Sequence, residues 1–153
     1  MKLSVSDFAD RINEVMPVIL REFSRKQSSE LLKGKVTLTQ ILILEFLERQ
    51  GIIKMTDIAR FMKVSTAATT GIVERLVKSG YVVRTFQEGD RRIVRIKINS
   101  RGLELVRRVA LERHKMLISI FGKVSDQDRF DYLRILMKIK DNLTKGVVKG
   151  NEE

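Results

Sequence analysis

The sequence predicts a mainly α-helical fold with one β-hairpin after its midpoint. Over most of the 153 residues, apolar side chains recur three or four positions apart, as on one face of an α-helix. Between residues 81 and 99 the apolar period falls to two, which is the spacing of a β-strand. The hydrophobic content of 43% is enough for a chain of this length to build a core. The predicted order is four helices, a hairpin and two more helices.

Residues 4–25 form the first predicted helix. Pro17, the only proline, lies inside it and should kink the helix or split it in two, because proline lacks the N–H group and crowds the preceding turn. Residues 28–35 are a predicted link. Thr37 then opens a second helix that is apolar over much of its circumference, which indicates a central, buried position, and Gly51 ends it.

Two shorter helices joined by a tight turn come next. The third helix is predicted over residues 56–62, and Lys63 and Val64 form the turn. Ser65 is a favourable N-cap for the fourth helix, because its hydroxyl can accept a hydrogen bond from a backbone N–H that has no other partner. This helix should run to Ser79 and stop before Gly80.

The hairpin has predicted strands at residues 81–87 and 93–99, joined by a charged tip at residues 88–92. In the second strand apolar and basic residues alternate, so one face should be apolar and the other basic. Ser100 is the predicted cap of a long fifth helix with an apolar stripe extending to Val124. Ser125 and Asp126 cap the last helix.

We expect a single domain over residues 1–153, with a central lobe at residues 36–102. The long helices outside it, in segments 4–25 and 103–147, carry apolar stripes that this small lobe cannot cover. A second copy of the chain would cover them, so these segments are the predicted dimerisation layer of a homodimer.

The composition excludes several classes of site. The chain has no cysteine, which removes disulfides and cysteine-ligated metals, and its one histidine, His114, rules out a multi-histidine metal site. The nine glycines do not form the dinucleotide or phosphate-loop patterns. We therefore predict no enzyme, no metal and no cofactor.

The formal net charge of +11 points to a polyanionic partner, with nucleic acid first and an anionic membrane surface second. A generally basic surface is the plainer alternative. No apolar run approaches the roughly 20 residues of a spanning helix, and the N-terminus has no apolar core of a signal peptide. We expect a cytoplasmic protein that does not associate with membranes.

A short helix, a tight turn, a capped helix and a hairpin together form a winged helix-turn-helix, so the fold class is mainly α with the small β component of a winged helix (α+β). The second helix of such a unit enters the DNA major groove with its N-terminal residues. Small and hydroxyl side chains there allow close approach to bases and phosphates, and Arg75 suits a phosphate; the alternative is an ordinary helix with a polar face. The predicted DNA-binding residues of this helix are Ser65, Thr66, Ala67, Thr70, Gly71 and Arg75.

The predicted wing carries Arg91 and Arg92 at its tip, where an arginine can enter the minor groove. Arg84 and Arg95 flank the tip as supporting residues. Asp90 should hold a neighbouring arginine by a charge-assisted hydrogen bond. Residues 54–102 have eleven basic and four acidic residues, a formal charge of +7 in about a third of the chain. A merely soluble, charged turn is the alternative.

These segments also carry a family resemblance. Residues 36–40 resemble a Leu-Thr-x-x-Gln helix opening, and residues 57–59 a Glu-Leu-Ala motif. Residues 70–76 and 80–84 resemble a recognition helix and first wing strand, residues 90–92 a wing signature, and residues 100–102 the helix start after it. Over residues 5–147 the chain resembles the MarR family of dimeric transcriptional regulators. Lys54 stands where the family often has a capping Thr, which suggests a third helix that starts at Thr56.

The resemblance implies a homodimeric repressor, or less often an activator, on a pseudo-palindromic operator in double-stranded DNA. It also implies release by a small, often anionic and aromatic effector, whose site we cannot assign. The predicted function is sequence-specific DNA binding in transcription regulation. The alternatives are an architectural DNA-binding protein or a protein-interaction dimer without operator specificity.

Overall fold

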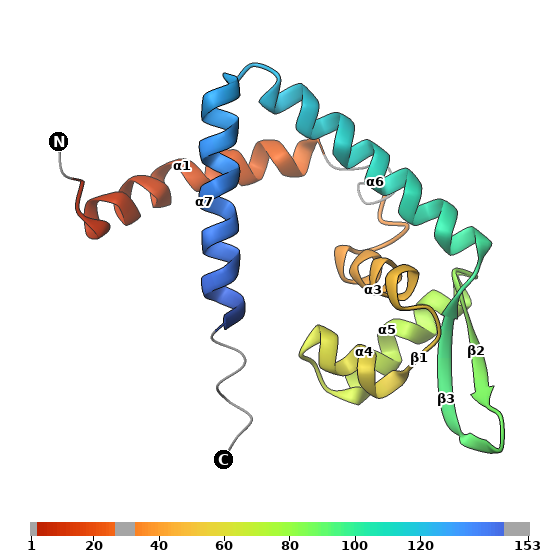
Figure 1. Cartoon of the computed structure of the whole chain (residues 1–153). Helices are drawn as coiled ribbons and strands as arrows, with labels where there is room; N and C mark the ends of the chain where they lie inside the picture. Colours follow the sequence, from red (N-terminus) through yellow and green to blue (C-terminus); the bar gives the residue numbers. More distant parts are fainter. Residues whose placement is uncertain (1–2, 27–32, 146–153) are drawn as a thin grey trace, which may run out of the picture. The chain divides into compact units, whose positions relative to one another are not determined.

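The computed structural model describes residues 3–26 and 33–145. Within these ranges the chain has six helices and three strands, and so confirms the mainly helical fold with one hairpin. In order they are α1 (Val5–Arg25), α3 (Leu38–Gln50), β1 (Ile53–Lys54), α4 (Met55–Met62), α5 (Thr66–Lys78), β2 (Val82–Gln87), β3 (Asp90–Ile98), α6 (Ser100–Phe121) and α7 (Asp126–Lys145) (Figure 1). The chain divides into two compact units, with the boundary after Arg113.

Helix α1 begins after Ser4, whose hydroxyl oxygen accepts a hydrogen bond from the N–H of Asp7 at 3.1 Å. It continues through Pro17 to Arg25, so the predicted split at this proline does not occur. None of its residues is buried, and its apolar side chains face solvent in the single chain. Most of the predicted link at 28–35 lies outside the described residues.

Helix α3 is the centre of the core, as its sequence predicts. The Thr37 hydroxyl accepts from the N–H of Gln40, and the Gln40 side chain accepts from the N–H of Thr37, which closes a capping box. The helix ends at Gly51, whose φ of +79° favours glycine. The fully buried core residues include Ile41, Ile43, Leu44, Leu47, Ile58, Val73, Leu76 and Ile96.

A short strand that the sequence did not reveal pairs with the second strand of the wing. In β1, Ile53 pairs with Ile96 and Lys54 with Arg95, so the antiparallel sheet has the order β1-β3-β2. A two-residue strand is too short for an alternating pattern. The predicted start of the third helix at Thr56 is one residue late, because α4 begins at Met55 with an N-cap at Lys54 that makes no side-chain bond.

The second strand of the wing is longer than predicted, and the tip of the wing is shorter. Only Glu88 and Gly89 form the turn, while β3 begins at Asp90 with Gln87 as its partner across the hairpin. The predicted five-residue tip is therefore wrong, and Arg91 and Arg92 belong to a strand. Charged residues do not indicate a loop here. The hairpin extends beyond α4 and α5, so charged residues of its strands remain in contact with water (Figure 1).

Asn99 links the end of the wing to the start of α6. Its side-chain oxygen accepts from the N–H of Gly102 at 3.0 Å, and its side-chain nitrogen donates to the carbonyl oxygen of Gly80 at 2.9 Å. The helix cap is therefore Asn99 and not Ser100, which is the first helical residue. Helix α6 ends at Phe121, before the predicted limit at Val124.

In the unit from His114 onward, the hydroxyl of Ser125 accepts from the N–H of Asp128 at 3.2 Å and caps α7, as predicted. The hydrogen bond from Gln127 and the ion pair with Arg134 hold the pKa of Asp131 below its ordinary value. Large apolar side chains of α7 are exposed in the single chain: Phe130, Tyr132, Leu133, Ile135, Leu136, Met137, Ile139 and Leu143. The end of the predicted segment 103–147 lies outside the described residues.

Candidate nucleic-acid interface

Helices α4 and α5 are joined by the tight turn that the sequence predicts. Lys63 adopts a left-handed conformation with φ of +53°, and the N–H of Val64 donates to the carbonyl oxygen of Ala59 at 3.2 Å. Ser65 then caps α5, since its hydroxyl accepts from the N–H of Ala68 at 3.2 Å. The turn therefore sets the direction of α5 with local hydrogen bonds.

One side of α5 is anchored in the core. Thr69, Val73 and Leu76 are fully buried there, four and three residues apart, and the Thr69 hydroxyl donates to the carbonyl oxygen of Ser65 at 3.0 Å. Because this side is buried, the opposite side of the helix is exposed to solvent. A helix held in this way can present a fixed set of side chains to a partner.

The predicted recognition residues lie on the solvent side of α5. Ser65, Thr66, Ala67 and Arg75 are exposed, while Thr70 and Gly71 are half-buried. The Thr70 hydroxyl donates to the carbonyl oxygen of Thr66 at 2.8 Å, which leaves its oxygen free to accept a further bond. A Cβ at Gly71 would meet no atom within 4 Å, so the surface beside this glycine is open.

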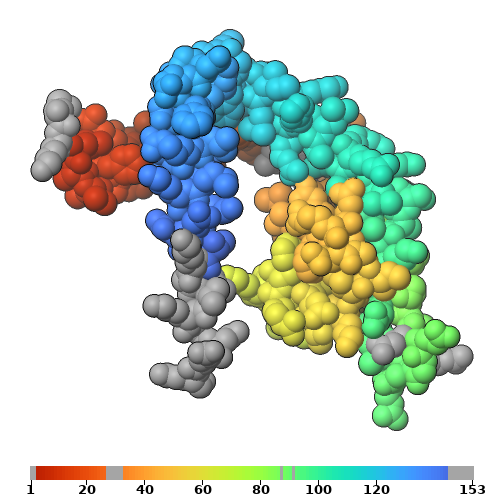
Figure 2. Space-filling model, in the orientation of Figure 1, coloured from red at the N-terminus to blue at the C-terminus, as the bar shows by residue number. Residues whose placement is uncertain are grey.

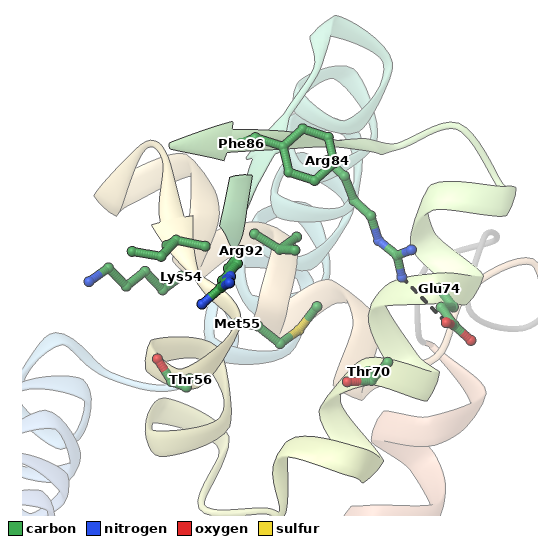
Figure 3. Close-up of a pocket in the computed structure, with 10 residues that line it drawn as sticks. Lys54, Met55, Thr56, Thr70, Glu74, Arg84, Phe86 and Arg92 are labelled. Atoms are coloured by element: carbon green, nitrogen blue, oxygen red, sulfur yellow. Dashed lines mark hydrogen bonds and ion pairs between the residues drawn. The ribbon is translucent and has the colours of Figure 1, made fainter. Parts of the chain in front are cut away.

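A pocket of about 590 Å³ lies between α5 and the wing (Figure 3). It brings together three of the predicted residues: Thr70 from α5, Arg84 from β2 and Arg92 from β3. The full lining is Lys54, Met55, Thr56, Thr70, Glu74, Arg84, Phe86, Arg92, Ile93 and Val94. Lys54 and Thr56 were missed as site residues because strand β1, which places them beside the wing, was not predicted.

Arg84 is tied to α5 by an ion pair. Its guanidinium lies 3.4 Å from the carboxylate of Glu74, and Figure 3 shows the pair bridging β2 and α5. Both side chains are well exposed, so the pair adds little stability. In this structure the pair places the Arg84 charge beside α5. Phe86 on the same strand, also not predicted as a site residue, is 60% exposed.

Near the tip of the wing, Asp90 holds Arg92 by its backbone. The Asp90 carboxylate accepts from the main-chain N–H of Arg92 at 2.9 Å, and the Arg92 side chain is exposed. The side chain of Arg91 lies outside the described residues. Arg95 is half-buried further along β3, opposite Thr85 and Lys54. Figure 2 shows the hairpin projecting beyond the surface of α4 and α5.

We also searched the part of the chain that the structure describes for a metal site and for a membrane-spanning helix. Its acidic residues and histidine form no cluster of three that could hold a metal ion. No helix within residues 3–26 and 33–145 is both long and apolar enough to cross a lipid bilayer.

Comparisons with known proteins agree with this geometry. The model of the MarR family matches residues 36–94, from the cap of α3 to the wing. The uncharacterized HTH-type transcriptional regulator YfiV of Bacillus subtilis (strain 168) is 31% identical over 120 residues, which span 76% of this chain and 75% of YfiV. The HTH-type transcriptional repressor MdtR of the same organism is 23% identical, over 90% of this chain and 97% of its own.

A solved structure has the same fold. The protein in the crystal structure of the S. aureus MepR–DNA complex superposes with a TM-score of 0.67, covering 86% of this chain and 98% of that one at 19% identity. The arrangement of a helix-turn-helix followed by a wing is therefore a fold that this chain has in common with that protein.

Proposed function

The chain belongs to the MarR family of HTH-type transcriptional regulators, and we propose that it binds a pseudo-palindromic operator in double-stranded DNA as a homodimer. The observation that carries the proposal is the solvent side of α5 beside the arginines of the wing. Both lie on the segment with a formal charge of +7. A surface of this charge attracts phosphates and loses affinity as salt rises.

In the proposed complex, α5 enters the major groove from its N-terminal end. The hydroxyl groups of Ser65, Thr66 and Thr70 bond bases or phosphates, and the methyl group of Ala67 can meet a thymine methyl. Gly71 lets the helix approach closely, and Arg75, one turn further on, neutralises a phosphate. The two copies of α5 would lie about one turn of DNA apart, ~34 Å or a multiple of it.

The wing would bind the minor groove next to that site. Arg92 enters the groove, with Arg91 beside it, because a narrow minor groove concentrates negative potential. Arg84 and Asp90 position the wing through their contacts with Glu74 and with the backbone of Arg92. Arg95, at mid-strand, supports the sheet behind them.

Dimerisation through the terminal helices is supported by their exposed apolar faces. Segment 4–25 and segment 103–147 would interleave with those of a second copy, outside the lobe at residues 36–102. The exposed apolar residues of α1 include Val5, Phe8, Ile12, Val15, Met16, Ile19 and Leu20. A dimer would bury this surface, and burial of apolar area is the main driving force for association.

The proposed role is repression in the cytoplasm, without enzymatic activity. A small anionic or aromatic effector would release the DNA by preferring a spacing of the two lobes that does not fit the operator. Such a ligand shifts binding only by the difference between its affinities for the two spacings.

An unbiased selection from a random pool of DNA duplexes, at about 150 mM salt, tests the proposal, because this salt weakens non-specific phosphate binding. Recovery of an inverted repeat is the expected result. Tight binding without any recovered motif would overturn operator specificity and favour an architectural protein. Failure to retain DNA, repeated with candidate effectors present and absent, would favour a protein-interaction dimer.

A further inference from the structure

A second pocket lies at the other end of α5, away from the proposed interface. It is formed where the C-terminus of α5, the start of β2 and the first turns of α6 meet, and it has a volume of about 580 Å³. Its lining residues are Lys35, Lys78, Ser79, Tyr81, Arg101, Glu104, Leu105 and Arg108. Nothing in the proposed DNA complex uses this pocket.

The lining is strongly basic. Four of the eight residues are Lys or Arg, and Glu104 is the only carboxylate among them. Neither Lys78 nor Arg101 has an ion-pair partner among residues 3–26 and 33–145. Like charges that converge in one concavity repel each other, so a bound anion would relieve this repulsion as well as form new bonds.

Arg101 is held in place before any ligand arrives. Its guanidinium lies over the ring of Tyr81, 5.3 Å from the ring centre. It also lies close to Gly80, where an added Cβ would be 3.4 Å from one of its nitrogens. The backbone beneath is fixed by the two hydrogen bonds of the Asn99 side chain. A positioned guanidinium loses less entropy on binding and presents several donors in one plane.

From these observations we infer that this pocket binds a small polyanion, a molecule with two or more adjacent negative charges such as a phosphate ester or a polycarboxylate. A single negative charge could compensate only one of the two cations, Lys78 and Arg101, that have no ion-pair partner among the described residues. Guanidinium groups suit phosphate and carboxylate oxygens because they can donate two parallel hydrogen bonds. Lys35, just before the lobe, and Lys78, at the end of α5, add charge from two other segments of the chain.

A small ligand fits better here than the backbone of the operator. Thirteen residues of helix separate Ser65 from Lys78, which is roughly 20 Å at 1.5 Å per residue. DNA held by the N-terminal end of α5 would therefore lie far from this concave site. The inference concerns binding to the free protein, so it does not depend on the proposed operator binding.

The test uses inorganic pyrophosphate as the probe, in 150 mM KCl without divalent cations. The chain has two tyrosines and no tryptophan, so in a Tyr132→Phe background the fluorescence of Tyr81 reports on the pocket. We expect a saturable change with a dissociation constant below about 1 mM, confirmed by titration calorimetry. Acetate at the same charge concentration should produce no saturable change.

Neighbouring arginines on α6 provide a matched pair of variants. Arg108→Ala removes a lining charge and should weaken pyrophosphate binding by roughly tenfold, the loss of one charge-assisted contact. Arg107→Ala removes the same charge from the adjacent position outside the lining and should change the affinity by less than about twofold. Lys78→Gln, which breaks no contact with Tyr81, should repeat the effect of Arg108→Ala.

Any of three results would overturn the inference. The first is the absence of saturable pyrophosphate binding, and the second is an equal response of the two arginine variants. The third comes from DNA binding: if Arg108→Ala and Lys78→Gln reduce the salt dependence of duplex binding as much as Arg75→Ala does, the surface is a phosphate contact of DNA. A failed operator selection would leave the pyrophosphate titration unaffected, so the two proposals fail independently.

Discussion

Gly102 contacts the carbonyl oxygen of Tyr81 so closely that a Cβ at position 102 would lie 2.3 Å from it. The same oxygen accepts a hydrogen bond from the N–H of Asn99 at 3.2 Å. The start of α6 and the start of the wing thus touch through backbone atoms, with no room for a side chain. Tyr81 lies between α5 and β2, so this contact connects α5, the wing and α6.

We expect Gly102→Ala to lower the free energy of unfolding by about 1–3 kcal/mol, since a methyl group would also lie 2.7 Å from Ile98. The change is measured by urea denaturation. Gly71→Ala is the matched control, because no atom lies within 4 Å of its added Cβ. In a helix interior this control should raise stability by roughly 0.5–1 kcal/mol. Equal effects of the two substitutions would contradict the close contact.

The same Gly71→Ala variant separates stability from DNA binding. If α5 approaches the major groove closely at Gly71, the added methyl group should weaken duplex binding by about fivefold, or ~1 kcal/mol, while the protein becomes more stable. Fluorescence anisotropy with a selected duplex measures the affinity, and thermal unfolding measures the stability. An unchanged affinity would mean that DNA does not contact α5 at this turn of the helix.

Arg92 is expected to contribute more to DNA affinity than an arbitrary surface charge. Arg92→Ala should weaken binding by about 1–3 kcal/mol if its guanidinium enters the minor groove, and it should reduce the salt slope by about one. Lys26→Ala removes one positive charge at the end of α1 and serves as the control. The wing hypothesis would be rejected by equal losses in the two variants.

Much of this fold could be predicted because its boundaries are set by local chemistry. Thr37 and Ser65 cap their helices with side-chain bonds to residues three positions on, and Gly51 takes a positive φ. Each of these features involves neighbours in sequence, so a single sequence reveals them. The core face of α5 could be predicted for the same reason, from its helical spacing.

The features that the sequence did not reveal depend on partners far along the chain. Strand β1 forms because Ile53 pairs with Ile96, and a segment of two residues is too short to carry a pattern that predicts this pairing. Asn99 replaces Ser100 as the cap because its side chain also bonds Gly80, nineteen residues earlier. The pocket beside the wing follows from the same tertiary contacts, since β1 carries Lys54 to the second wing strand.

Glu74 is expected to limit DNA affinity by holding Arg84. Glu74→Gln removes a negative charge beside the proposed interface and releases the guanidinium, so duplex binding should strengthen by about twofold to fivefold at low salt. Stability should fall by less than about 1 kcal/mol, because both partners are exposed. Glu48→Gln makes the same charge change on α3 and should have a smaller effect. A loss of affinity in the Glu74 variant would instead mean that DNA binding needs the fixed position of Arg84.

The exposed apolar face of α7 gives the sharpest test of the dimer. Leu133 is 58% exposed in the single chain, and Leu133→Glu would place a charge within the proposed dimer layer. Burial of an unpaired carboxylate is costly, so the dimer dissociation constant should rise at least roughly 100-fold, as seen by sedimentation equilibrium. Asn142→Glu adds the same charge nine residues later, about half a turn around the helix from Leu133, and should leave the dimer intact. If the two variants associate equally well, α7 does not bury this face in a dimer. A monomeric Leu133→Glu protein that still binds a half-site duplex would separate dimerisation from recognition by α5.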